Sequence, residues 1–413
     1  MTTISDAPRD ARAGDAAGQA QPGGRQLFVL DREVHYLSEG EAAWGDARPI
    51  PIPAAWDFGP GKTGNAALFP RRVVDARGQQ MDVYSSTSPQ WLYKQPGTGR
   101  MVQIANVIGV GQAETVAGVN NQQVWYRVST DGGETFTALA PIAQQGNTAL
   151  NPLPGILIGV NGYWPSVSSL VELSNGQLVV PVSYWPLDGR GLPTITRYPV
   201  ASFSVSAVLL GTWNATRDDL SWRLSERVFV PETRSTRGAN EPAVAELQGQ
   251  PGRLLMLCRG SNEHAPEQPS RRWLAVSEDY GATWSEPRPF CYDDGTCFYS
   301  QSAASDLVRA GNRRLYWLGN TALTNPRGNS PRYPLQAGEV DEASLALIRG
   351  SVLTIDDRNP LYDSLDVQLA GFTTYLDPAQ GGLLVYLKRV DTTDQALANE
   401  GRFPHNWYRL GFR

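Results

Sequence analysis

Apolar residues occur along this chain in short runs that turn-forming residues interrupt. The runs at residues 27–30, 178–184 and 383–387 are rich in β-branched, leucine or aromatic side chains and are bounded by Gly, Pro, Asn or Asp, as β-strands are. No segment repeats apolar residues at i, i+3, i+4 and i+7 over three helical turns. With 41 Gly and 30 Pro as punctuation, the pattern predicts an all-β chain.

A pair of strands joined by a Gly-containing turn recurs through the sequence. The clearest copies are residues 165–183 and 242–259, and weaker copies are residues 70–86, 302–319 and 372–389. The starts of these copies are 95, 77, 60 and 70 residues apart. Spacings of this size are typical of the blades of a β-propeller, each of which is a four-stranded antiparallel sheet.

The five hairpins leave the number of blades open. Residues 390–413 and 26–65 have the length of one more blade, so we expect six blades. Seven is the alternative, because the 95-residue step has room for another sheet. The strands at residues 27–37 and 406–412 are expected to pair and close the ring.

Residues 26–413 are therefore expected to form a single β-propeller domain. Residues 1–25 are rich in Ala, Asp, Gly and Pro and are expected to form a disordered arm. This segment lacks the apolar stretch of a secretory signal. The expectation is a cytoplasmic protein, with export by another route as the alternative.

A second repeat has the pattern Ser-x-Asp-x-Gly-x-Thr-aromatic. It occurs at residues 129–136 and 277–284, and residues 214–222 resemble an eroded third copy. The Asp side chain can accept N–H groups within the turn, Gly permits a positive φ, and the aromatic ring packs between sheets. We therefore expect Asp131 and Asp279 to be exposed turn residues far from any chemistry.

Charge and composition exclude several classes of partner. Lys and Arg number 36 against 41 Asp and Glu, which disfavours nucleic-acid binding. The sequence contains no run of about 18 apolar residues, which is the length that a membrane-spanning helix needs. All but three of the basic residues are arginines, which reflects either base composition or the reading of carboxylates. Cys291 and Cys297 enclose a turn and either pair or remain free thiols.

The two Asp-containing turns, together with Asn240-Glu241-Pro242 and the strand that ends at Arg259, resemble the sialidase superfamily and its BNR-repeat relatives. The resemblance is close over residues 240–284 and looser over residues 65–390. It implies a six-bladed propeller whose central site holds a substrate carboxylate on three arginines. It also implies a tyrosine nucleophile, a glutamate that activates it, and an aspartate as acid/base.

Carried onto this sequence, the resemblance makes Glu241 the activating carboxylate and Arg259 a carboxylate-binding arginine. Arg332 is preferred to Arg327 as a second carboxylate-binding arginine, because the prolines that flank Arg332 fix its backbone. The first carboxylate-binding arginine of the family precedes a proline. This chain has no arginine there, and Arg72, which follows a proline, is the substitute. The alternatives are a strand-end carboxylate that caps a neighbouring backbone for Glu241, a blade-edge cation for Arg259 and a surface role for Arg332. Glu241 and Arg259 could also form a merely structural ion pair.

The resemblance assigns the nucleophile to Tyr375, although a shift of three residues would put Phe372 there. The segment at residues 87–94 has no carboxylate where the acid is expected, and Asp82 or Asp75 is the nearest substitute. His264, on the loop after Arg259, is either a substrate-binding or basic residue or a solvated one. The cluster Glu339-Val-Asp341-Glu342 reads as a solvated turn, with acid/base or cation-binding chemistry as the alternative.

Carried onto these residues, the resemblance implies a sialidase-like glycoside hydrolase that releases a terminal acidic sugar (sialic, other ulosonic or uronic acid) from a glycan. The alternatives are a polysaccharide lyase acting on uronate and a carbohydrate-binding propeller without turnover. No cofactor or metal is implied, because the metal-ligand and phosphate-loop motifs are missing from the sequence. The expected partner is an acidic glycan, with no nucleic acid and no membrane.

Overall fold

The computed structural model describes residues 26–36, 72–84, 92–95, 97–109, 121–168, 170–197, 203–216, 218–377, 381–391 and 404–412. The arm expected at residues 1–25 lies outside this part of the chain. Within it the regular structure consists of strands and one short 3₁₀ turn, η3 (Arg349–Ser351), without an α-helix. The all-β prediction is confirmed. No helix in these residues is long and apolar enough to span a membrane.

The strands form five antiparallel sheets, each opened by one of the five predicted hairpins. The first has β2 (Arg72–Val74), β3 (Gln80–Tyr84), β4 (Leu92–Lys94), β5 (Met101–Gly109), β6 (Gln122–Ser129) and β7 (Ala140–Pro141). The second has β8 (Tyr163–Pro165), β9 (Val171–Glu172), β10 (Leu178–Tyr184), β11 (Val205–Trp213) and β12 (Leu220–Leu224). The third has β13 (Asn240–Glu246), β14 (Leu254–Arg259), β15 (Arg272–Ser277) and β16 (Arg288–Pro289).

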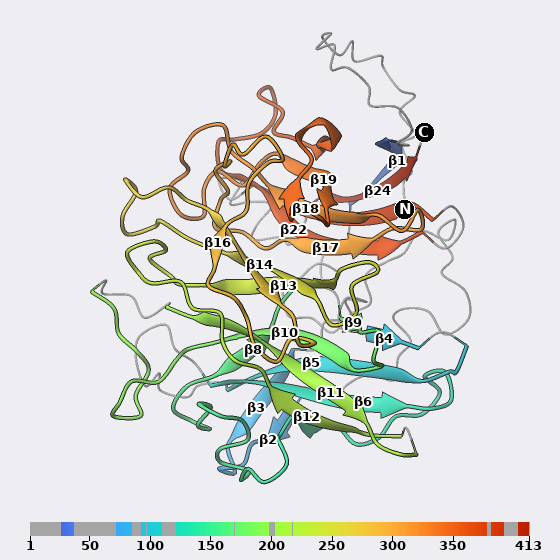
Figure 1. The fold of residues 1–413 in the computed structure, drawn as a ribbon, viewed down its shortest axis with the longest axis vertical. Coiled ribbons are helices and arrows are strands. Elements are labelled where there is room, and N and C mark those ends of the chain that lie inside the picture. Colours follow the sequence, from blue (N-terminus) through green and yellow to red (C-terminus); the bar gives the residue numbers. More distant parts are fainter. Residues whose placement is uncertain are drawn as a thin grey trace.

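The fourth sheet has β17 (Asp306–Arg309), β18 (Leu315–Asn320), β19 (Leu335–Asp341), β20 (Ala346–Leu347) and β21 (Leu353–Asp356). The fifth has β22 (Val367–Leu376), β23 (Leu383–Asp391), β24 (Pro404–Phe412) and β1 (Leu27–Tyr36). The N-terminal strand β1 pairs with the C-terminal strand β24 along its length (Figure 1). The predicted pairing of the two ends of the propeller is confirmed.

The described residues form five blades, which does not support the prediction of six blades or the alternative of seven. The sequence predicted that residues from the two ends of the chain would form the sixth blade. Instead β24 and β1 become the third and fourth strands of the blade that β22 and β23 begin. The described residues of the 95-residue step form one enlarged sheet, in which β2 and β4 are additional short strands.

The core lies between neighbouring blades. On β10, Val180 packs in the apolar cluster shared with the first sheet, and Val179 packs in the cluster shared with the third. Alternate residues of a strand face opposite sides of its sheet. Because both faces of a central blade are buried, β10 is apolar at nearly every position rather than at every second one.

The turns of the Ser-x-Asp-x-Gly-x-Thr-aromatic repeat, which we call Asp-boxes, close one end of the blades. In the third blade Asp279 accepts hydrogen bonds from Ser277 Oγ (2.8 Å), Thr283 N (2.9 Å) and Thr283 Oγ1 (2.7 Å). Asp131 makes the same set in the first blade, and Asp218 closes the corresponding turn in the second. The predicted turn chemistry is confirmed.

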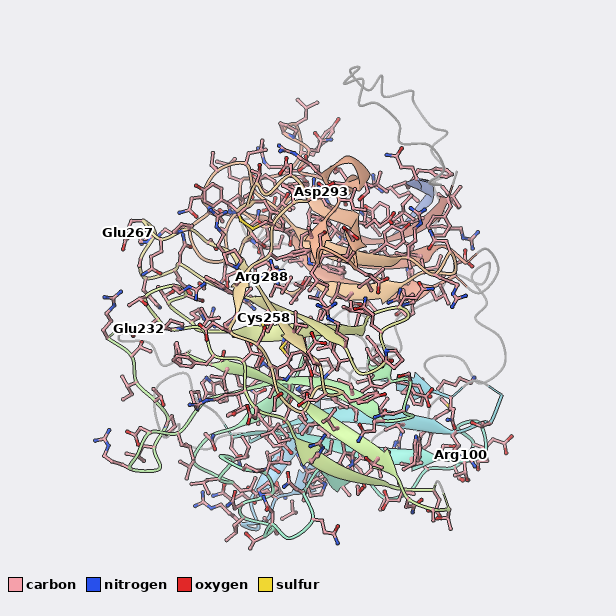
Figure 2. The ribbon with its side chains drawn as sticks, in the orientation of Figure 1. Arg100, Glu232, Cys258, Glu267, Arg288 and Asp293 are labelled. Carbon is pink, nitrogen blue, oxygen red and sulfur yellow. A yellow bond between two sulfur atoms is a disulfide. The ribbon has the colours of Figure 1, made fainter. Side chains whose placement is uncertain are left out.

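Strand direction fixes which residues meet at the opposite end. Each inner strand begins there, and the second strand of each blade ends there, whereas the Asp-boxes lie between third and fourth strands. Glu232 and Glu267, on the loops before β13 and after β14, lie at one edge of the view (Figure 2). Arg100, in the turn before β5, lies at the opposite edge. We call the end with Glu232 and Glu267 the site end.

Candidate functional site

Glu241 and Arg259 form a buried ion pair at the site end of the third blade. Asn240, next to Glu241, is the register partner of Arg259 across β13 and β14. Arg259 Nη1 lies 2.7 Å from Glu241 Oε1, and the two side chains are 10% and 20% exposed. The hairpin argument from the sequence, that these two ends meet, is confirmed.

Glu241 has a backbone conformation that is uncommon for a residue with a side chain. Its φ is +42°, in the left-handed region, and β13 bulges between Asn240 and Ala243. The strained backbone is held by its N–H, which donates to Ser183 Oγ (2.8 Å) on the second blade and to Asn240 Oδ1 (2.8 Å). Such strain costs about 1–3 kcal/mol and is concentrated at functional sites.

The fourth blade fixes the guanidinium of Arg259. Arg259 Nε donates to Ser302 Oγ (2.8 Å), and Nη2 donates to Asn329 Oδ1 (2.9 Å). With Glu241 on Nη1, each of the three nitrogens has a partner. Arg259 is therefore held rigidly in one orientation.

Arg332 joins the same cluster from the loop between β18 and β19. Its Nη2 donates to the Ser302 carbonyl (2.9 Å), and its own carbonyl accepts Leu369 N (2.9 Å) at the start of β22. Burial, together with the charge of Arg259, lowers the pKa of Arg332 to about 10. Arg327, the other sequence candidate on this loop, is exposed.

Two further arginines belong to this cluster and were missed from the sequence. Arg237 lies three residues before Asn240 and faces Glu263 (3.5 Å). Arg272 is the register partner of Arg259 on β15 and is fully buried. The sequence signal for Arg237 was its position just before the Asn-Glu-Pro segment. The signal for Arg272 was a charged residue at the start of an otherwise apolar strand.

The arginines control the charge of Glu241. Burial alone would raise the pKa of this carboxyl, but Arg259, Arg332 and Arg237 outweigh burial and hold the pKa below its ordinary value. Glu241 is therefore ionised near neutral pH. Four arginines face two carboxylates, those of Glu241 and Glu263, so the cluster carries an excess of positive charge.

Several polar atoms of this cluster are buried and have no hydrogen-bond partner among the described residues. They are Glu241 Oε2, Arg237 Nε, Arg332 Nε, and Arg272 Nε and Nη1. Buried polar groups are nearly always paired, and an unpaired one costs about 1–3 kcal/mol. The unpaired donors, beside excess positive charge, fit an anionic ligand.

Arg72 and Asp82 lie elsewhere. Arg72 Nε donates to Asp82 Oδ1 (3.1 Å) across the β2–β3 pair, and the Arg72 side chain is 64% exposed. In the described part of the chain, these two groups contact each other rather than the arginine cluster. Asp75, the other substitute acid, accepts the backbone N–H groups of Arg77 and Gln79 and so closes a turn.

Tyr375 lies far from the cluster, because β22 carries it to the Asp-box end. Arg332 pairs with Gln368 at the start of β22, and Tyr375 is seven residues further along, roughly 20 Å at the rise of a strand. Its ring packs beside Trp407, with centroids 6.1 Å apart. Burial, followed by the nearby Tyr386, raises the pKa of Tyr375. The structure does not bring this phenol to Glu241.

The remaining sequence candidates are structural or peripheral. His264 is partly buried on the loop between β14 and β15. In the acidic segment, Glu339 pairs with Arg314 (2.8 Å) and Glu342 pairs with Arg309 (2.7 Å), while Asp341 accepts Ser344 Oγ (2.6 Å). The ion pairs and the turn favour the structural interpretation. No group of three potential metal ligands occurs in the described residues.

Cys291 and Cys297 form a disulfide across their turn. Cys258 is a free, buried thiol on β14 that lies in the interior, between the sheets (Figure 2). Burial raises the pKa of Cys258 to about 12. The thiol is therefore protonated near neutral pH and is a poor nucleophile.

Five antiparallel blades, Asp-box turns at one end and a buried arginine–glutamate cluster at the other define an Asp-box β-propeller. The BNR repeat-like domain family matches residues 69–355. The match covers well over half of the chain, so the chain belongs to this family of BNR-repeat proteins. A comparison with curated protein sequences finds no match.

Solved structures share the fold at low sequence identity. A mutant of NanB sialidase from Streptococcus pneumoniae is 12% identical with a TM-score of 0.50, over 78% of this chain and 55% of that one. The chain thus spans about half the length of that sialidase. A protein of unknown function from Dyadobacter fermentans is 12% identical with a TM-score of 0.53, over 94% of this chain and 100% of that one.

Proposed function

We propose that this protein is a sialidase-like glycoside hydrolase that acts on the terminal acidic sugar of a glycan. The observation that carries the proposal is the buried cluster of Arg237, Arg259 and Arg332 around Glu241. Arg259 is already fully engaged, whereas Arg237 and Arg332 keep an unpaired Nε. A planar carboxylate accepts two parallel N–H bonds from a guanidinium, so the sugar acid would satisfy these donors.

Glu241 is the group that would move a proton. One of its oxygens binds Arg259, and the buried Oε2 has no partner among the described residues. As an ionised carboxylate it can accept a proton from a hydroxyl group or a water molecule beside the bound sugar. Arg237 replaces Arg72 in this proposal as the third arginine.

The position of Tyr375 favours a second candidate, a carbohydrate-binding propeller without turnover. A sialidase-type reaction needs a nucleophile beside the glutamate, and Tyr375 lies at the other end of β22. Binding through the arginine cluster requires no nucleophile. The two candidates share the ligand and differ in whether a bond is broken.

A panel of glycans ending in sialic, other ulosonic or uronic acids tests both candidates. The protein is incubated with each glycan, product is read by mass spectrometry, and binding is read by calorimetry. Release of the acidic sugar supports the hydrolase, and binding without release supports the second candidate. Arg332→Ala should abolish either signal, whereas Arg72→Ala, in an exposed arginine outside the cluster, should preserve it. If no acidic glycan binds, or both variants behave alike, the proposal is wrong.

A further inference from the structure

Two tryptophans pack against each other on the second blade, the blade whose Ser183 contacts Glu241. The rings of Trp164 and Trp185 lie 4.3 Å apart at an interplanar angle of 48°. Trp185 is 7% exposed, and Trp164 is more exposed. Trp185 is fixed by its backbone, since its carbonyl accepts Asn161 Nδ2 (2.7 Å). Trp185 is thus buried, and Trp164 is partly open to solvent.

Strand register shows which way the pair faces. Trp164 is the register partner of Ser183 across β8 and β10, and directly opposed residues project from the same face of a sheet. Ser183 Oγ accepts the N–H of Glu241 (2.8 Å), so this is the face toward the third blade. Trp185 follows Ser183 by two residues and projects from the same face. Both indoles therefore lie on the Glu241 side of the second blade.

The site thus has two chemically different sides. Toward the fourth blade, Arg259 and Arg332 bond to Ser302 and present charge. Toward the second blade, Glu241 binds Ser183, and the two tryptophans lie on the same face of that blade as Ser183. A carboxylate suits the first side. The second suits an uncharged ring that has an apolar face.

Core packing does not account for Trp164. The paired aromatic rings elsewhere in the described residues are mostly interior, as with the edge-to-face pair of Phe290 and Trp317, which are both 0% exposed. Trp164 keeps exposed surface at the end of a strand, where a polar residue would be expected. Partly exposed aromatic side chains beside convergent polar groups are typical of ligand sites.

We propose that Trp164, supported by Trp185, is the binding platform for the neutral sugar that follows the acidic one in the glycan. The inference rests on the proposed function, because the arginine cluster fixes where the acidic sugar lies. The C–H face of a hexose packs flat against the indole, and its hydroxyl groups remain at the edges. The platform makes the site selective for an acidic sugar attached to a neutral one over the acidic sugar alone.

The test compares matched ligands by titration calorimetry. One pair is the methyl glycoside of N-acetylneuraminic acid and sialyllactose. The other is methyl glucuronide and glucuronic acid linked to xylose. For the acidic sugar that binds, the longer ligand should bind wild-type protein roughly tenfold more tightly, as expected for one stacked ring. Trp164→Ala should remove this gain and leave the affinity for the short ligand unchanged.

Two variants guard against a folding artefact. Trp164→Phe keeps a ring and should retain most of the gain. Trp213→Ala changes a partly buried tryptophan of the same blade that pairs with Leu220 at the Asp-box end, so the gain should persist. Each variant is first compared with wild type by melting temperature.

The outcomes separate the two proposals. If the short ligand binds but the longer one gains nothing, or Trp164→Ala weakens both equally, the platform is overturned while the proposed function stands. If lactose alone binds through Trp164 and no acidic ligand binds, the proposed function fails and the aromatic surface alone binds sugar. Absence of binding to all these ligands overturns both.

Discussion

Asp279 and Glu241 are carboxylates at opposite ends of the third blade, and their surroundings differ in every respect. Asp279 is exposed, and both its oxygens accept hydrogen bonds from its own turn. Glu241 is buried on a left-handed backbone, with one oxygen on Arg259 and the other without a partner in the described residues. The hydrogen bonds of Asp279 are all made within its turn, whereas Glu241 keeps one oxygen that a ligand could pair with.

The contrast shows how a structural carboxylate is told from a functional one. A turn stabilises itself by pairing its polar groups, so nothing remains for a ligand. At the site end, the excess charge of the buried arginines and the unpaired oxygen of Glu241 raise the free energy of the unliganded protein. A ligand that pairs those groups lowers it again, which is the basis of specific binding.

The largest effect should follow from Glu241→Gln. The amide keeps the size of the side chain but cannot accept the proton, so kcat on a cleaved acidic glycan should fall about 10²–10⁴-fold. KM should change little if the arginines alone hold the sugar. Steady-state kinetics measures both constants. Unchanged kcat in a folded variant would show that Glu241 is only an ion-pair partner.

The same variant has a pH signature in stability. The folded-state pKa of Glu241 is held below its ordinary value, so its charge stabilises the fold above the unfolded pKa of about 4.3. This contribution is lost as pH falls through the folded pKa. Wild type should therefore be more stable than Glu241→Gln at pH 7, and the gap should narrow in acid. Melting curves between pH 7 and pH 3 test this, and a gap that is independent of pH would contradict it.

A smaller effect is expected for Arg332→Lys. A lysine keeps the charge but cannot make the two-pronged contact, so KM should rise roughly 10–100-fold while kcat stays close to that of wild type. Arg72→Lys is the matched control, because Arg72 is exposed and paired with Asp82. Equal behaviour of the two variants would remove Arg332 from the binding site.

The smallest effect is expected for Asp279→Ala, and it should be on stability alone. Burial would raise the pKa of Asp279, but hydrogen bonds from Thr283 and Ser277 outweigh it and lower the pKa. Because the turn is exposed, the loss should be about 1 kcal/mol, or a melting temperature lower by a few degrees. Turnover of the folded protein should be unchanged. A variant with lost activity and normal melting would place the Asp-box in the site.

Local chemistry made much of the fold predictable from the sequence. The Asp-box turns and the five hairpins depend on residues close together in the chain, such as Ser277, Asp279 and Thr283. The number of blades depends on where distant strands pair. Nothing local in residues 404–412 shows that β24 extends the sheet of β23 rather than starting another.

The candidate site divides in the same way. Glu241 and Arg259 were predictable because one hairpin joins them. Arg237 and Arg272 were missed because their proximity to Glu241 comes from the packing of loops and of a third strand. Tyr375 was assigned from the family resemblance, by its place before a hairpin, and the length of β22 carries it to the other end of the blade.

The central claim is that the arginine cluster at the site end binds a carboxylate. Calorimetric titration with an acidic glycan from the panel, and with the same glycan after its carboxyl group is reduced to an alcohol, tests this most directly. The acidic form should bind at least about 100-fold more tightly, as expected when charge-assisted bonds to buried arginines are lost. Equal affinity for the two forms would contradict the account.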